Sequence, residues 1–375
     1  MTGDAEKSIP PLQSYDPFPR ILTQTLRLSP LTLGLVLFIA DLIVGGWLGW
    51  RYDVFLSTSE TPGILQDLTA LATEFVSIPV IAGVYLWTLI GATELFRYLY
   101  KAPVFKSEAT LVEIVDKSRP IFSNRLVFYI ILVLSVLYAL SQVSAYMGWV
   151  PWRSASAYLE LYPPMSFVRA PFWFFNFYTM LYGMFNVTVT VITLRKLFRT
   201  REIEVLPLHP DQSGGLRSIS QYSIRIAYAI GAAGLVISAA TVFEIQHGTL
   251  FVAYPIMVGI VAYIMFAPFF FFWPLGTAHE AMQEAKEAEL LRLAQEFERV
   301  YDRVKQGDIE HTEAYENDMK RLEHLKQLYE IAQEFPVWPF DTQNLRRFFA
   351  VVTTPVLPAI ISVVTEFLTN LFAVG

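Results

Sequence analysis

Four acidic side chains lie inside stretches of sequence that are otherwise almost wholly apolar, and they are the residues best placed to do chemistry. They are Asp41, Glu74, Glu244 and Glu366. A carboxyl group within an apolar segment of membrane-spanning length is costly, and such groups usually line ion paths or proton relays. Carboxylate oxygens replace the hydration shell of a cation, or they bind a proton. Together with the amide of Asn186, these residues form a candidate ion path.

Three interpretations of these acids stay open. They line a cation path, they are protonated and hydrogen-bonded between helices, or they lie at a membrane interface in contact with water. We favour the interface for Glu74, Glu94 and Glu244. Asp41 differs because it lies about ten residues from either end of its apolar stretch. We expect it to face the bundle interior without a basic partner, with Asn186 as a candidate hydrogen-bond partner.

A loop supplies the second candidate site, in which His209 and Asp211 are two positions apart. The pair has the chemistry to bind a cation or a lipid headgroup, or to act as an acid and a base. A rigid turn, in which Asp211 caps the following residues and His209 packs locally, is the favoured alternative. No third ligand lies nearby in sequence, although His279 is expected at the same membrane face. We therefore predict no metal site, no cofactor and no enzymatic activity.

Long apolar helices must position these residues. Hydrophobic residues make up 54% of the chain and charged residues only 17%, against about 25% charged in soluble domains. The predicted fold class is all-α, a polytopic membrane protein with about seven transmembrane helices, since about 20 apolar residues cross a bilayer. The predicted spans are 31–50, 70–95, 126–149, 172–194, 226–246, 250–274 and 349–372. Pro355 and Pro358 are expected to kink the last one or to leave it in the interface.

Positive charge alternates between the segments that join these spans. Of the 28 Lys and Arg residues, 25 lie in the N-terminal segment and in every second segment after it. Since cytoplasmic loops carry the excess of Lys and Arg, the N-terminus is predicted inside and the C-terminus outside. The chain is thus expected in the cell (inner) membrane, with the lipid bilayer as its surroundings. The sequence contains no dense basic stripe, so it gives no indication of nucleic-acid binding.

Residues 279–333 are rich in charged residues and predict a cytoplasmic antiparallel hairpin of two helices in coiled-coil contact. The expected seam comprises Leu290, Ala294, Phe297, Tyr301 and Val304, then Tyr315, Met319, Leu322, Leu325, Leu328, Tyr329 and Ala332. This stripe is wider than one partner helix needs, which favours a homo-oligomer or the binding of a cytoplasmic protein. A hairpin that packs only on itself stays open.

Four regions result from these features. Residues 1–30 form a cytoplasmic segment with a short interfacial helix near Ile21–Leu28, and residues 31–276 form six spans. Residues 277–335 form the hairpin, and residues 336–375 hold a segment rich in Pro and aromatic residues followed by the seventh span.

Two segments carry a family resemblance. One reads Pro-Leu-His-Pro-Asp-Gln-Ser-Gly-Gly-Leu over 207–216, and the other reads Phe-Pro-Val-Trp-Pro-Phe-Asp over 335–341. Together they resemble an uncharacterised group of bacterial polytopic membrane proteins. The resemblance covers these two segments only, and it implies no activity.

The sequence therefore favours one class of function and leaves another open. Acids within spans, and short segments on the outer side, favour an oligomeric channel or transporter for a cation. The alternative is a sensor or scaffold that transports nothing and signals through the hairpin. An enzyme at the inner face is the least favoured class.

Overall fold

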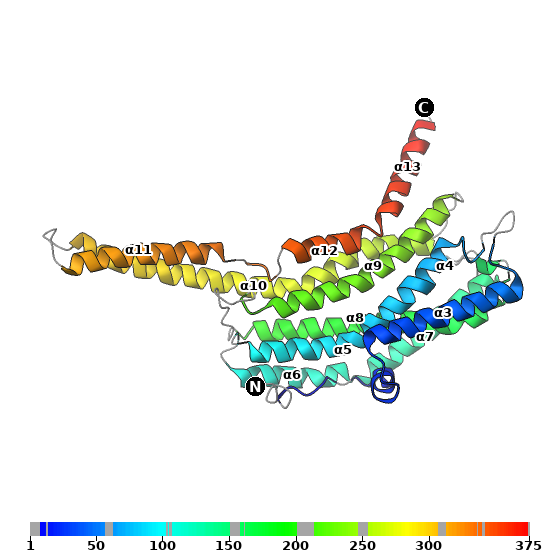
Figure 1. The fold of residues 1–375 in the computed structure, drawn as a ribbon, viewed down its shortest axis with the longest axis horizontal. Coiled ribbons are helices and arrows are strands. Elements are labelled where there is room, and N and C mark those ends of the chain that lie inside the picture. Colours follow the sequence, from blue (N-terminus) through cyan, green and yellow to red (C-terminus); the bar gives the residue numbers. More distant parts are fainter. Residues whose placement is uncertain are drawn as a thin grey trace.

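The computed structural model describes residues 8–12, 14–56, 63–102, 104, 107–150, 158–160, 162–200, 214–246, 254–306, 313–335, 337–339 and 342–373. All regular elements in these ranges are helices. Figure 1 shows them as an elongated bundle from which a pair of helices extends at one end. The predicted all-α class is confirmed.

Within the described residues, six helical segments are long and apolar enough to cross a membrane. They are α3 (Pro30–Tyr52), the continuous run of α4 (Leu68–Ala72), η2 (Thr73–Ser77) and α5 (Ile78–Lys101), α7 (Arg125–Tyr146), α8 (Met165–Phe198), α9 (Arg217–Gln246) and α10 (Tyr254–Gln306). They correspond to the first six predicted spans and indicate a multi-pass membrane protein.

The outward surfaces of α3 and α7 suit lipid rather than water. Leu31 and Trp50, near the two ends of α3, are 84% and 75% exposed, and Leu126 of α7 is 68% exposed. Such a continuous apolar surface is unfavourable in water and favourable against acyl chains. α5, in contrast, is buried along most of its length and forms the centre of the bundle.

Glycine lets α3 and α5 lie in close contact. A Cβ atom on Gly34 would stand 2.9 Å from the carbonyl oxygen of Pro79, and one on Gly83 would stand 2.9 Å from that of Pro30. Gly34 of α3 thus lies beside Pro79 of α5, and Pro30 lies beside Gly83, so the first turns of the two helices are in contact and the helices run antiparallel. Such close backbone approach is typical of helix contacts in membranes.

The seventh predicted span is bent. α12 (Thr342–Thr353) and α13 (Leu357–Ala373) meet at an angle of 51° across a short break that contains Pro355. α12 packs against α9, where a Cβ atom on Gly231 would stand 2.5 Å from the carbonyl oxygen of Val351. It also contacts α10, because the hydroxyl of Tyr263 donates to the carbonyl of Val352 at 2.8 Å. α13 points away from the bundle (Figure 1). The bend agrees with the kink expected from proline.

The segment that leads into α3 contains α2 (Pro17–Arg20) and a π-helical turn, η1 (Ile21–Thr25). A further helix that was not predicted, α6 (Glu108–Phe122), follows α5 and buries Leu111 and Val115. It was missed because the loop was assigned only by its charge, although Ser107 caps it with a hydrogen bond to the N–H of Thr110 at 3.3 Å.

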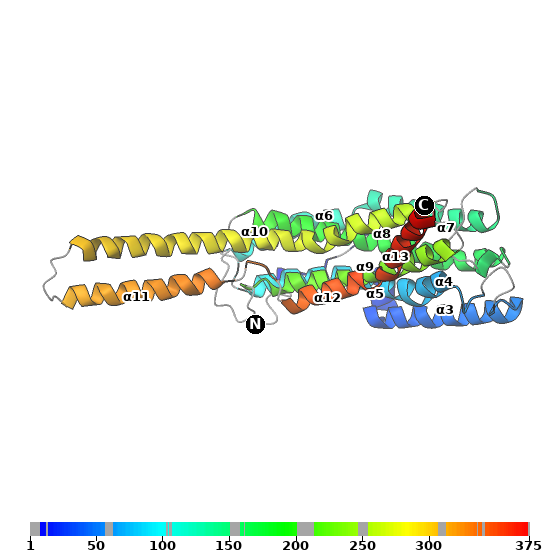
Figure 2. The same ribbon diagram turned by 90° about the horizontal axis from the view of Figure 1, so that it is seen from above.

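α10 continues without a break beyond the apolar region and pairs with α11 (Glu313–Glu334), as Figure 2 shows. Arg303 bonds to Asp318 and Arg321 to Glu296, so the two helices run antiparallel. The buried contacts come from Leu293 and Val300 on α10 and from Leu322, Leu325 and Ala332 on α11.

The predicted seam of this pair was partly wrong. Phe297 and Tyr301 are 38% and 50% exposed, and Ala294 is exposed as well. On α11, Tyr315, Met319, Leu328 and Tyr329 are also exposed. On α10, Leu293 and Val300 face α11 instead. One helix covers only a narrow stripe of its neighbour, so the remaining apolar residues of the predicted seam are left uncovered.

Candidate functional site

Arg169 lies buried between two carboxylates that come from different helices. Its Nη1 donates to Oδ1 of Asp41 at 3.0 Å, and its Nη2 lies 2.8 Å from Oε2 of Glu74. Its Nε donates to the hydroxyl of Tyr158 at 2.9 Å, and that hydroxyl donates to Oε1 of Glu74 at 2.9 Å. The exposed fractions of the three charged side chains are 1% for Arg169, 0% for Asp41 and 5% for Glu74. We call these four residues the buried ion cluster.

The local backbone explains how the cluster forms. α8 begins at Met165, so Arg169 lies in its second turn and points inward rather than into a loop. Gly45 makes room for the guanidinium, because a Cβ atom there would stand 3.0 Å from Nη2 of Arg169. Asp67 fixes Tyr158 by accepting its backbone N–H at 3.0 Å. Burial, followed by the charge of Glu74, raises the pKa of Tyr158 well above its ordinary value, so its hydroxyl stays protonated.

The cluster corrects two expectations about the acids. Asp41 was expected to lack a basic partner, and it is paired with Arg169. Glu74 was expected at the water interface, and it is buried and bonded to Tyr158. The expectation was wrong because Arg169 had been counted as a loop charge. Two carboxylates now share one guanidinium, and Oδ2 of Asp41 is buried with no hydrogen-bond partner in the described structure.

Further polar contacts follow the interface between α5 and α8. The amide of Asn186 donates to Oγ1 of Thr88 at 3.0 Å, and the hydroxyl of Tyr222, on α9, donates to Oγ1 of Thr190 at 3.3 Å. Asn186 therefore bonds to Thr88, and the candidate hydrogen bond from Asn186 to Asp41 is absent from the described structure. From Arg169 to Thr190 the rise along α8 is about 30 Å, which is the thickness of a bilayer core. We call the contacts of Thr88, Asn186, Thr190 and Tyr222 the polar stripe.

A segment near the N-terminus crosses one end of the bundle. This strap comprises residues 8–12 and 14–16. The N–H of Leu12 donates to Oγ1 of Thr93 at 3.1 Å, and Nε of Arg97 donates to the carbonyl of Ile9 at 2.9 Å. Asp16 accepts from the hydroxyl of Tyr85. Burial raises the pKa of Asp16 above its ordinary value, although the Tyr85 hydroxyl and a backbone N–H oppose the shift.

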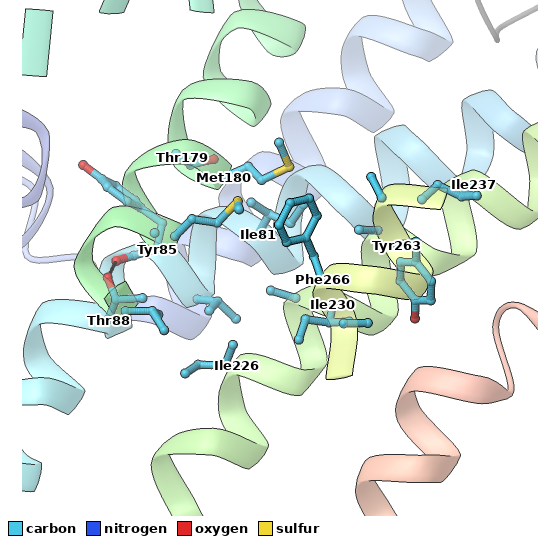
Figure 3. Close-up of a pocket in the computed structure, with 18 of the residues that line it drawn as sticks. Ile81, Tyr85, Thr88, Thr179, Met180, Ile226, Ile230, Ile237, Tyr263 and Phe266 are labelled. Atoms are coloured by element: carbon cyan, nitrogen blue, oxygen red, sulfur yellow. Dashed lines mark hydrogen bonds between the residues drawn. The ribbon is translucent and has the colours of Figure 1, made fainter. Parts of the chain in front are cut away.

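A cavity of about 320 Å³ lies between α5, α8, α9 and α10 (Figure 3). Apolar side chains such as Met180, Ile230 and Phe266 surround it. The hydroxyl of Thr88, also in the lining, already donates to the carbonyl of Tyr85 at 2.6 Å and accepts from Asn186. The cavity thus lies beside the polar stripe but offers little of its own to a polar ligand.

The remaining candidate residues are dispersed or not described. Glu94 is exposed, and its position at an interface stays a prediction. Glu244 and Glu366 lie on α9 and α13, but their side chains are outside the described structure, as are His209 and Asp211. Nδ1 of His279 lies 2.7 Å from the carbonyl of Val337, and its ring stacks on that of Trp338 with centroids 3.9 Å apart. No group of three His, Asp or Glu side chains able to hold a metal occurs in the described ranges.

Sequence reasoning missed Arg169, Tyr158 and Asp16. Arg169 had a usable signal, since Phe167 and Val168 precede it and an apolar aromatic run follows it. Tyr158 and Asp16 lie in connecting segments and carry no periodic signal. A comparison with protein-family models, curated proteins and solved structures finds no match for this chain.

Proposed function

We propose that this chain is a membrane transporter or channel for a cation, in which the buried ion cluster carries the exchangeable charge. Asp41 is the group that binds the cation. Arg169, which also contacts Glu74, holds the Asp41 carboxylate in place, and Tyr158 positions Glu74. The transported or coupled ion is a proton or an alkali cation, because one positive charge completes the cluster.

The charge of the cluster is the observation that carries the proposal. When both acids are ionised, Asp41, Glu74 and Arg169 leave one negative charge in excess. A buried charge without compensation is strongly unfavourable, the more so inside a membrane. One bound cation or proton brings the cluster to neutrality, and the unbonded Oδ2 of Asp41 is a free acceptor for it. Uptake and release of this charge are the elementary steps of transport.

The polar stripe continues the path along α5 and α8. Oδ1 of Asn186 and Oδ1 of Asn176 are buried without a hydrogen-bond partner in the described structure, and both are suited to bind water. The cavity beside Thr88 gives α9 and α10 space to move against α5 and α8. That movement would hydrate the stripe and connect the cluster with the opposite face.

The orientation belongs to the same proposal. The N-terminus and the pair α10–α11 lie in the cytoplasm, α13 ends outside, and two or more copies associate. Support for the orientation comes from the asymmetric distribution of Lys and Arg. Support for association comes from the uncovered apolar face at Phe297, Tyr301 and Met319.

Flux measurements test the proposal. In reconstituted vesicles the wild-type chain should conduct or exchange H⁺, Na⁺ or K⁺, and Asp41→Asn should abolish that flux. The variant should stay folded, because Glu74 and Arg169 remain as a neutral pair. Asp53→Asn is the matched control, since Asp53 is an exposed acid that ends the same helix. Vesicles that show no wild-type flux under voltage, tension or a pH gradient would contradict the proposal, as would an Asp41→Asn variant with normal flux.

A sensor or scaffold is the second candidate, and the continuity of α10 favours it. This helix runs from Tyr254 through Gly276 to Gln306 without interruption, so a displacement in the membrane part is carried rigidly to the tip. Under this proposal Phe297→Asp abolishes association of the full chain in detergent and removes the signal. Asp41→Asn would then leave the output unchanged, which separates the two candidates.

A further inference from the structure

A groove on the bundle surface lies between α3, α5 and α9. Its volume is about 520 Å³, and its walls include Leu31, Leu35 and Phe38 from α3 and Val80 from α5. Leu31 and Leu35 are 84% and 57% exposed. The groove thus belongs to the apolar surface that faces lipid, and it starts at the level where α3 begins.

Arg225 forms one wall at this end of the groove. Its guanidinium carbon lies 4.9 Å above the ring centroid of Trp87, and the side chain is exposed. No carboxylate of the described residues pairs with it, whereas Arg169 and Arg303 both have acidic partners. A cation at the edge of an apolar surface, without an acid to neutralise it, is free to bind an anion.

Trp87 adds an independent observation. It lines the same groove and is 9% exposed, and its indole Nε1 is buried with no hydrogen-bond partner in the described structure. A buried N–H without an acceptor is rare in folded proteins, so this one calls for an acceptor from outside the chain. Tyr228, which is 49% exposed, places a phenol in the same wall. Tryptophan and tyrosine prefer the headgroup level of a membrane.

We propose that this groove binds an anionic phospholipid. Its phosphate pairs with Arg225 and comes within reach of the Trp87 N–H, and one acyl chain lies along Leu31, Leu35 and Val80. A ligand that fills the groove needs both a phosphate and an acyl chain, because a free phosphate leaves the apolar walls uncovered. A zwitterionic lipid carries its own positive charge, which competes with Arg225 for the phosphate. The volume lies within the range of about 300–1,000 Å³ found for ligand sites.

Thermal unfolding of the purified full chain in neutral detergent tests the site, because a ligand that binds the folded state raises the unfolding temperature. Phosphatidylglycerol mixed into the micelles should raise it saturably. Arg225→Gln should shift the half-maximal lipid fraction upward by about fivefold, the effect of one basic residue near an anionic lipid. Arg225→Lys should keep most of the response. Arg195→Gln, which removes an exposed arginine near the end of α8, is the matched control and should behave like the wild type.

Each further arm distinguishes a source of the effect. Phosphatidylcholine should give no saturable rise, and neither should inorganic phosphate or glycerol phosphate. If inorganic phosphate raises the unfolding temperature as much as phosphatidylglycerol does, the site binds small anions, and the proposed phospholipid ligand is wrong. If Arg225→Gln and Arg195→Gln weaken the response to phosphatidylglycerol equally, the response is a general attraction between basic residues and acidic micelles. That result would contradict a specific site at Arg225. Unfolding temperatures without lipid show that each variant is folded.

Discussion

Two arginine–carboxylate pairs, one in the bundle and one on the α10–α11 pair, differ mainly in their surroundings. In the bundle, Arg169 lies 3.0 Å from Asp41 and is 1% exposed. On the α10–α11 pair, Arg303 lies 3.1 Å from Asp318 and is 54% exposed. The distances are nearly equal, so the contact geometry alone does not distinguish the two. Burial decides what each pair does.

Water sets the difference. Around α10 and α11, each partner is solvated when its counterpart is removed, so the pair adds little to stability. In the buried ion cluster, the charged partners stabilise one another where no water reaches them. Removal of one partner therefore leaves the others charged and uncompensated in a medium of low dielectric constant. An exposed pair can therefore be exchanged freely during evolution or design, whereas the cluster constrains α3, η2 and α8 together.

Replacement of Arg169 should have the largest effect. Arg169→Leu leaves Asp41 and Glu74 buried, close together and without a cation, so the free energy of unfolding should fall by about 3–5 kcal/mol. Thermal unfolding in detergent measures the loss, and the yield of monodisperse protein should fall with it.

Removal of every charge is the control for this prediction. The triple variant Arg169→Leu, Asp41→Asn, Glu74→Gln has no stranded ion and should regain most of the lost stability, because neutral groups of similar shape replace ions at small cost. If Arg169→Leu alone unfolds at the wild-type temperature, the cluster is not the buried ionic contact described here.

The α10–α11 pair should depend on its apolar contacts instead of its ions. Leu293→Ala removes a side chain that is 3% exposed and should lower local stability by about 2–3 kcal/mol, the lower part of the range for buried leucine. Leu291→Ala is the matched control, because Leu291 is 60% exposed on the same turn. Hydrogen exchange of α10 and α11 in the full chain measures both. Equal effects of the two variants would contradict the assigned core.

The strap offers an intermediate case, since Asp16 is buried among the hydroxyls of Tyr85, Tyr178 and Tyr182 rather than beside a cation. Burial raises its pKa, so the folded state prefers the protonated acid. The strap should therefore be held most firmly at acidic pH and loosen as the pH rises through the raised pKa of Asp16. Hydrogen exchange of residues 8–12 and 14–16 across this range measures the effect. Asp16→Asn should remove the pH dependence, and firmer attachment at higher pH would contradict the assignment.

Much of the fold could be predicted from the sequence because lipid demands long apolar helices. The first six spans were predicted from hydropathy alone, and Pro355 marked the bend of the seventh segment. Asp41 was identified as unusual from its position within an apolar stretch. These features are local, so a single sequence is sufficient for them.

The partners of the acids could not be predicted, because they depend on contacts between distant segments. Arg169 was assigned to a loop since its span was predicted to begin at residue 172, whereas α8 begins at Met165. Its contact with Asp41 joins residues 128 positions apart, and its contact with Glu74 joins α8 to η2. With the fourth span predicted to begin at residue 172, Arg169 was counted among the charges outside the membrane. For that reason no basic partner for Asp41 was predicted.

The smallest effect is expected at Arg303 and Asp318, and it completes the comparison. Their contact lowers the pKa of Asp318 and raises that of Arg303, as a hydrogen-bonded ion pair should. Both side chains nevertheless face water, which screens the attraction and solvates either group when it is alone. Arg303→Ala, Asp318→Ala and the double variant should all unfold within experimental error of the wild type, and any shift should vanish in high salt. A double-mutant cycle in the full chain isolates the coupling between the two residues. A coupling as large as that of Arg169 with Asp41, or one that persists in high salt, would show that burial is not what separates the two regions.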